Sequence, residues 1–162
     1  MNLLDTFLKN STDVENENFI LNQEQTREFI EKNSTTESFL HLPSLEIEKS
    51  DIKIDKEGIE SAFIECNFAI ADTGSVVLES TEEKIRLASS LSEHFYAVVY
   101  KSNLKKSILE LDEFMEKRMS SINSYIAFIT GASRTADIER VLTIGVHGPV
   151  KMSVIIIDEE LK

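Results

Sequence analysis

The chain has 162 residues, 41% hydrophobic and 28% charged, which favours one globular domain with a sizeable core and excludes a disordered or collagen-like chain. Its 29 acidic and 17 basic residues give a net charge of -12, which disfavours binding to nucleic acid or to an acidic membrane surface. No apolar run approaches the roughly 20 residues of a membrane-spanning helix and no signal peptide opens the sequence, so we expect a cytoplasmic protein.

The first third of the chain predicts two short helices and some edge strands. Apolar residues recur at helical spacing over 2–9, and a second helical pattern covers 23–33. The polar, acidic stretch between them, 10–18, predicts a linker. Between 39 and 54, Pro43 and alternating apolar residues favour edge strands.

The rest of the chain predicts an α/β sheet. Four apolar runs predict buried strands, at 63–71, 95–100, 125–130 and 152–157. Helical spacing predicts helices between them, at 81–91, 103–119 and 132–142. Because buried strands separated by helices are typical of parallel sheets, we expect the four strands to share the mostly parallel central sheet of a three-layer αβα fold. The difference between this strand–helix pattern and the first third of the chain predicts a helical and irregular segment, 1–55, followed by an α/β domain, 56–162.

Three glycine-containing loops at the ends of apolar runs carry the candidate ligand-binding residues. These are Asp72, Thr73, Gly74 and Ser75 in the first loop, Gly131, Ser133, Arg134 and Thr135 in the second, and Gly145, His147 and Gly148 in the third. Ligands of open α/β sheets bind beyond the carboxyl ends of the strands, so we expect the loops to line one cleft there. The first loop is equally well explained as a plain β-turn.

The second loop has the features of an anion site. Free amides at the helix start after Gly131 attract an anion, and Arg134 adds a guanidinium suited to carboxylate or phosphate. Between 120 and 157 three basic residues outnumber two acidic ones, a local change of sign in an acidic chain. The alternative is that Ser133 caps the helix and Arg134 pairs with Asp137 on its surface.

His147 is the candidate general acid or base. It stands beside glycine in the third loop, and Asp72 or Asp137 would orient it. The alternative is a histidine that only donates to a loop carbonyl. The other two histidines are interpreted as structural.

Cys66 is the only cysteine, which excludes an internal disulfide and an iron–sulfur cluster held by this chain alone. Its apolar neighbours predict a buried packing residue. We expect neither a metal site nor a cofactor in the isolated chain.

Five segments form a pattern known from one protein family. They are AIADTGSVVL (69–78), Arg86 with LASSL (87–91), HFYAVV (94–99), ITGASRTADIE (129–139) and IGVHGPVKMSVIII (144–157). Together they resemble the lactate-utilisation (LUD) domain family, in its lactate utilisation protein C (LutC/YkgG) branch. Ala132 departs from the family's usual proline, and this change removes no charged or glycine position.

The resemblance implies a fold like that of ribose-5-phosphate isomerases, glucosamine-phosphate deaminases and coenzyme A transferases. It also implies a place in a bacterial system that oxidises L-lactate to pyruvate, in which two other proteins hold the iron–sulfur clusters. We therefore expect a cluster-free accessory component that binds a small anion, the iron–sulfur proteins, or both.

Two further interpretations stay open. In the first, the chain is a stand-alone enzyme that acts on a phosphorylated or carboxylated metabolite, with His147 as general acid/base. In the second, the chain is a scaffold without a ligand of its own. The sequence leaves open whether the chain has turnover.

Overall fold

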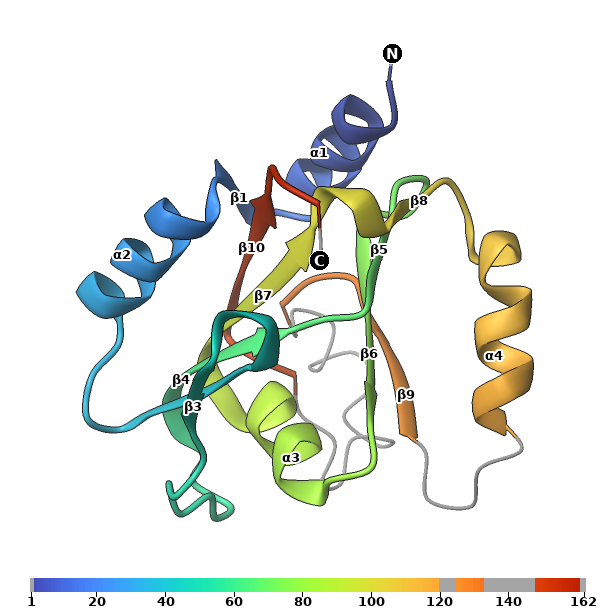
Figure 1. Cartoon of the computed structure of the whole chain (residues 1–162). Coiled ribbons are helices and arrows are strands. Elements are labelled where there is room, and N and C mark those ends of the chain that lie inside the picture. Colours follow the sequence, from blue (N-terminus) through green and yellow to red (C-terminus); the bar gives the residue numbers. More distant parts are fainter. Residues whose placement is uncertain (1, 120–124, 133–147, 161–162) are drawn as a thin grey trace.

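A computed structural model describes residues 2–119, 125–132 and 148–160. Two sheets form the body of this part of the chain (Figure 1). The central sheet has the order β1 (Glu17–Leu21), β10 (Lys151–Ile157), β7 (Ser92–Tyr100), β4 (Ile59–Glu65), β2 (Ser38–Leu42) and β3 (Ile47–Lys49). The smaller sheet has the order β8 (Leu104–Lys105), β5 (Phe68–Ile70), β6 (Ser75–Ser80) and β9 (Tyr125–Ile129).

The central sheet is mostly parallel. Its strands pair in parallel from β1 to β2, and only β3 runs antiparallel, at the edge. The central strands β7 and β10 read as nearly continuous apolar runs because both of their faces are covered. The expected mixed α/β fold, a mostly parallel central sheet flanked by helices, is confirmed.

The prediction that four strands share this sheet is wrong for two segments. The run 63–71 is divided: β4 ends at Glu65 in the central sheet, and β5 begins at Phe68 in the smaller one. The strand predicted at 125–130 is β9, which pairs antiparallel with β6. The smaller sheet packs between the central sheet and α4; its strands β5 and β6 are largely buried, whereas the apolar edge strand β9 is partly exposed.

Four α-helices are present in the described part of the chain: α1 (Leu3–Asp13), α2 (Gln23–Asn33), α3 (Glu83–Leu91) and α4 (Asp112–Met119). The first three agree with the helical patterns in the sequence, whereas the linker expected at 10–18 contains the end of α1 and the start of β1. The helix expected at 132–142 lies almost wholly outside the described residues. No helix in the described ranges combines the length and apolar character needed to cross a bilayer.

The continuous helix predicted over 103–119 is wrong in its first half. That stretch contains the strand β8, the short 3-10 helix η3 (Ile108–Leu111) and then α4. The apolar residues of this stretch, which follow helical spacing, pack into two different cores. Leu104 packs into the core between the sheets, whereas Leu111 and Met115 pack on the outer face of the smaller sheet. Hydrogen bonding of β8 to β5 thus outweighs the helical preference of the sequence.

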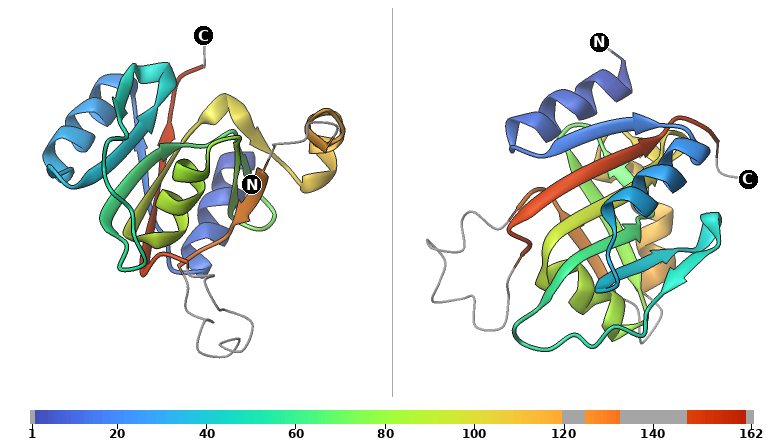
Figure 2. Two further views of the ribbon diagram at one scale, coloured as in Figure 1. Left: turned by 90° about the horizontal axis from the view of Figure 1, so that it is seen from below. Right: turned by 90° about the vertical axis from the view of Figure 1, so that its left-hand side faces the viewer.

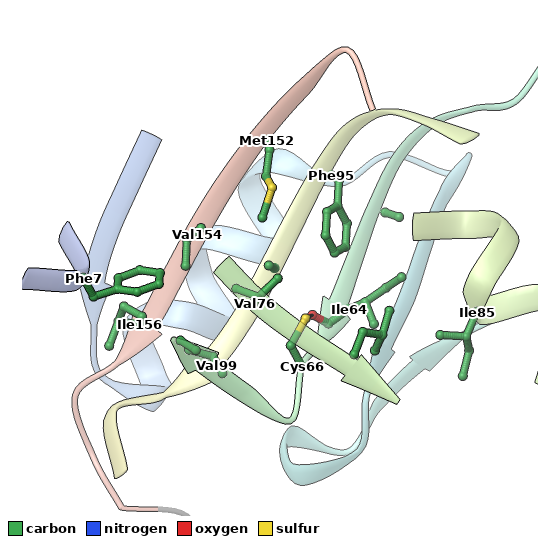
Figure 3. Close-up of a cluster of buried hydrophobic side chains, with 14 of the residues drawn as sticks. Phe7, Ile64, Cys66, Val76, Ile85, Phe95, Val99, Met152, Val154 and Ile156 are labelled. Carbon is green, nitrogen blue, oxygen red and sulfur yellow. Dashed lines mark hydrogen bonds between the residues drawn. The ribbon is translucent and has the colours of Figure 1, made fainter. Parts of the chain in front are cut away.

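The main core lies between the two sheets, where α1 and α3 close its ends. In Figure 3, Phe7 from α1 and Val76 from β6 meet the inward side chains of β7 and β10. Cys66 belongs to this core with 3% of its surface exposed, and burial raises the pKa of its thiol.

A second core covers the opposite face of the central sheet beneath α2, which lies across that face in the right-hand view of Figure 2. Three of the six strands, β1, β2 and β3, come from the first 55 residues. The division of the chain at residue 55 stays a prediction.

Candidate functional site

The first predicted loop is a tight turn between β5 and β6. Gly74 has φ +70°, and its amide donates to the carbonyl oxygen of Ile70 at 2.9 Å. A Cβ at this glycine would lie 2.6 Å from the backbone nitrogen of Ser11 in α1. Glycine is required both by the backbone conformation and by this close approach. Asp72 and Thr73 are exposed at the tip of the turn.

Side-chain hydrogen bonds tie the turn to the end of β9. Thr73 Oγ1 donates to Ser75 Oγ at 2.8 Å, and Ser75 Oγ lies 2.9 Å from Thr130 Oγ1. Asn16 Nδ2 donates to the carbonyl oxygen of Thr130 at 2.9 Å. Gly131 follows directly, so the structure brings the first predicted loop and the start of the second together. These bonds connect the turn and the segment before β1 to the end of β9.

A buried acceptor lies beside Gly131. Asn16 is 6% exposed, and its Oδ1 has no hydrogen-bond partner among the residues that the structure describes. A Cβ built on Gly131 would lie 3.4 Å from this oxygen. The other predicted site residues of the second and third loops lie outside the described residues. They are Ser133, Arg134, Thr135, Asp137, Gly145 and His147.

Gly148 is the one described glycine of the third loop, and it lines an open groove of about 1490 Å³. We call this hollow the amino-edge groove, because the strands β4, β7 and β10 begin along it. Its floor and walls include Ser61, Ser92, His94, Tyr96, Gly148 and Lys151, together with residues 51–53 and 56–58. The expected position at the carboxyl ends is therefore wrong for Gly148. Its loop precedes the parallel strand β10 rather than following it.

Four polar residues stand side by side on the central sheet; Ser61, His94 and Lys151 line the amino-edge groove, whereas Ser38 is fully buried beside them. The strand register sets Ser38 beside Ser61, Ser61 beside His94, and His94 beside Lys151. Neighbouring strands lie roughly 4.8 Å apart, so these side chains form one continuous polar row on a single face. Ser38 Oγ and Ser61 Oγ are hydrogen-bonded at 2.7 Å.

The His94 ring is held by stacking and by a hydrogen-bonded chain. It stacks on Tyr96 with a centroid separation of 3.8 Å, and Tyr96 stacks on Phe63 at 4.1 Å. His94 Nε2 lies 2.8 Å from Ser153 Oγ, which donates to Glu17 Oε1 at 3.3 Å.

The same contacts set the charges of the ionisable groups in and beside this hydrogen-bonded chain. Burial, and then the positive charge of Lys151, lower the pKa of His94, whereas burial raises the pKa of Tyr96. The hydrogen bond from Lys151, whose Nζ lies 3.0 Å from Glu17 Oε1, lowers the pKa of Glu17. At neutral pH the groove therefore holds a neutral imidazole beside an ion pair.

The sequence analysis interpreted His94 as structural and did not predict its place in the groove. The available signal was the alternation of Ser92, His94 and Tyr96 at the start of a predicted strand, which sets three polar side chains on one face. His41 fits its structural interpretation, because its Nδ1 lies 2.7 Å from Glu48 Oε1 across the β2–β3 pair.

A smaller cavity of about 330 Å³ lies at the opposite edge, where β2 and β4 end. His41, Glu65, Cys66 and Glu79 are among the residues that line it. Glu65 Oε1 accepts hydrogen bonds from the amide and the hydroxyl of Ser44, at 2.9 and 2.8 Å. Across the described ranges, no group of three or more His, Cys, Asp or Glu side chains is arranged to hold a metal ion.

Comparison with known proteins gives one family. The sequence model of the family described as LUD domain matches residues 7–157. Proteins named Lactate utilization protein C are similar to the chain, with 36% identity over 93 residues in Bacillus licheniformis and 33% over 129 residues in Shouchella clausii. The two alignments cover 56% and 76% of this chain, and 39% and 56% of those relatives, so the chain spans about half of their length.

One solved structure has the same fold. It is the crystal structure of a protein of the DUF162 family from Deinococcus radiodurans, which superposes with a TM-score of 0.69 over 96% of each chain. The two sequences are 16% identical, so this likeness concerns the fold alone.

Proposed function

The chain belongs to the LUD domain family, and on that premise we propose that it takes part in lactate utilisation as an accessory component that binds a small anion. The observation that carries the proposal is the 33% identity with the Lactate utilization protein C of Shouchella clausii over 76% of the chain. The aligned part of that relative is 56% of its length, so the proposed role is that of the shared domain.

The amino-edge groove is the proposed binding place. Lys151, whose ammonium is also paired with Glu17, supplies a positively charged donor at the end of the polar row, and neutral His94 supplies a hydrogen-bonding nitrogen beside it. Ser92 also lines the groove; it is 2% exposed, and its hydroxyl has no partner among the described residues. The net charge of -12 disfavours a large polyanion, whereas a small anion can reach a local cation inside a groove.

Arg134 remains the proposed main charged contact of the anion. Residues 133–147 connect Ala132 to Gly148, and Gly148 lines the amino-edge groove. An arginine in that connection would add a planar, two-point contact to the single charge of Lys151.

The proposed partners are the iron–sulfur proteins of a lactate-utilisation system in the cytoplasm. The only cysteine of this chain is buried in the main core, so the cluster ligands would come from those partners. This chain would contribute ligand binding.

The proposal is tested by calorimetric titration of the full chain with L-lactate, pyruvate and inorganic phosphate. Arg134→Ala should weaken binding of whichever anion binds by about ten- to hundredfold, since a hydrogen bond to a charged group is lost. Arg134→Lys should recover part of that affinity. Lys9→Ala is the matched control, because it removes an exposed ion pair with Asp13 on α1 and should leave the affinity unchanged.

Three results would change the proposal. Unchanged affinity in Arg134→Ala would assign this arginine to a surface pair with Asp137 instead. Absence of binding by all three anions would overturn the anion-binding role. Turnover by the isolated chain, lost in His147→Gln, would favour the enzyme interpretation.

A further inference from the structure

We propose that the amino-edge groove selects 2-hydroxy acids over 2-oxo acids, because His94 offers a bound ligand only a hydrogen-bond acceptor. The inference rests on the proposed function, namely that a small carboxylate binds in this groove. It adds the chemical feature that the ligand must carry, a hydroxyl donor next to its carboxylate.

The acceptor character follows from counting protons along the chain Glu17–Ser153–His94. Glu17 is ionised beside Lys151, so its carboxylate can only accept. Ser153 has one hydroxyl proton and donates it to Glu17 Oε1 at 3.3 Å. Ser153 Oγ must then accept from His94 Nε2, at 2.8 Å, so Nε2 carries the ring proton.

A neutral imidazole has one ring proton, which leaves Nδ1 with a lone pair. Burial against Tyr96 and the charge of Lys151 both favour this neutral form. None of the residues that the structure describes donates a hydrogen bond to Nδ1. Among the described residues Nδ1 is therefore an acceptor without a donor, on a ring that lines the groove.

The neighbours of His94 select the rest of the ligand. Lys151 stands beside His94 in the register of β7 and β10, about one strand spacing away. Its ammonium, which also pairs with Glu17, suits a carboxylate whose adjacent carbon carries the hydroxyl. Ser92, on the same face as His94, lines the groove, and its buried hydroxyl has no partner among the described residues.

A 2-oxo acid cannot donate a hydrogen bond to Nδ1 of His94. A 2-oxo group has lone pairs and no proton, so it would set an acceptor against Nδ1 and leave both unsatisfied. A site that accepts a hydroxyl proton discriminates against analogues that lack this proton, and the discrimination increases with burial.

The test compares binding of L-lactate, pyruvate and propionate to the full chain. L-Lactate should bind about three- to tenfold more tightly than propionate, the range of one partly exposed hydrogen bond, and pyruvate no more tightly than propionate. His94→Phe keeps the ring on Tyr96 and should abolish the preference. Ser153→Ala keeps His94 but frees its proton to occupy either nitrogen, so the lactate-to-propionate ratio should fall while propionate affinity is retained.

The matched control is Ser38→Ala, a serine change in the same polar row two strands away from His94, which should leave the ratio unchanged. Nitrogen NMR of the imidazoles gives an independent measurement, with the His94 signals assigned by their loss in His94→Phe. Nε2 should be protonated and Nδ1 unprotonated, and a proton on Nδ1 would overturn the inference. Equal binding of the three acids would overturn it and leave the proposed function standing. If none of them binds, the inference is overturned, and the proposed function then stands only if inorganic phosphate binds.

Discussion

His94 shows how contacts around one side chain set its charge and its proton position. Stacking on Tyr96 removes water from one face of the ring, and the ammonium of Lys151 opposes a second positive charge nearby. Both effects favour the neutral imidazole. The hydroxyl of Ser153 then decides which ring nitrogen carries the proton.

The lowered pKa of His94 predicts how stability depends on pH. When the pH falls below 6.5, the ordinary histidine pKa, His94 takes up a proton in the unfolded chain before it does so in the folded chain. Its contribution to the free energy of unfolding is therefore full above pH 6.5 and is lost as the pH falls through the lower, folded pKa. Urea denaturation at pH 7.5, 6.5 and 5.5 should show this decline, and His94→Gln should make it shallower. Ser38→Ala should retain the original slope; an unchanged slope in His94→Gln would contradict the assignment.

The residue scale also shows what the sequence can and cannot predict about a site. The turn at Gly74 was predictable, because Asp-Thr-Gly after an apolar run is a local pattern that a positive φ then fulfils. The importance of His94 was not, because it depends on Lys151 and Ser153, which reach it only through the pairing of β7 with β10. Contacts between residues distant in the chain leave no mark in local periodicity.

The same difference separates the elements that the sequence predicts well from those it does not. Helix α2 agrees with its pattern at both ends, since its start is fixed by neighbouring residues. Strand β1 begins in the stretch 10–18 that reads as a polar linker, because β1 forms by pairing with β10 and its side chains stay exposed or only partly buried. The stretch before α4 has a helical stripe, yet the two cores that it contacts lie on different sides of the smaller sheet.

The start of α2 gives a prediction at this scale. Asn22 Oδ1 accepts from the amide of Gln25 at 2.7 Å, and Gln25 Oε1 accepts from the amide of Asn22 at 2.9 Å, so each side chain satisfies a free backbone donor. Asn22→Ala should lower the free energy of unfolding by about 0.5–2 kcal/mol in urea titrations, and Asn22→Ser should recover most of the loss. Equal stability of the alanine and serine variants would show that the cap contributes nothing here.

At the scale of the whole molecule, two sheets of different topology share one core. The inward side chains of β6 in the smaller sheet and of β7 and β10 in the central sheet belong to the same buried cluster (Figure 3). The first 55 residues enter the body as well, through α1 on this core and through β1 and β2 in the central sheet. Neither sheet keeps its apolar face covered without the other, which favours a single folding unit.

This shared core predicts that both sheets unfold together. Leu78→Ala in β6 and Ile156→Ala in β10 each remove a buried side chain, with 3% and 0% exposure, and each should lower the free energy of unfolding by about 2–5 kcal/mol. If the sheets form one cooperative unit, native-state hydrogen exchange should give the slowest amides of β6 and β10 the same free energy of opening in the wild type, and either substitution should lower both equally. An effect of Leu78→Ala confined to amides of the smaller sheet would mean that this sheet opens by itself. The central sheet with α2 would then be the more stable unit, and the amino-edge groove, which β4, β7 and β10 form, would persist while the smaller sheet is open.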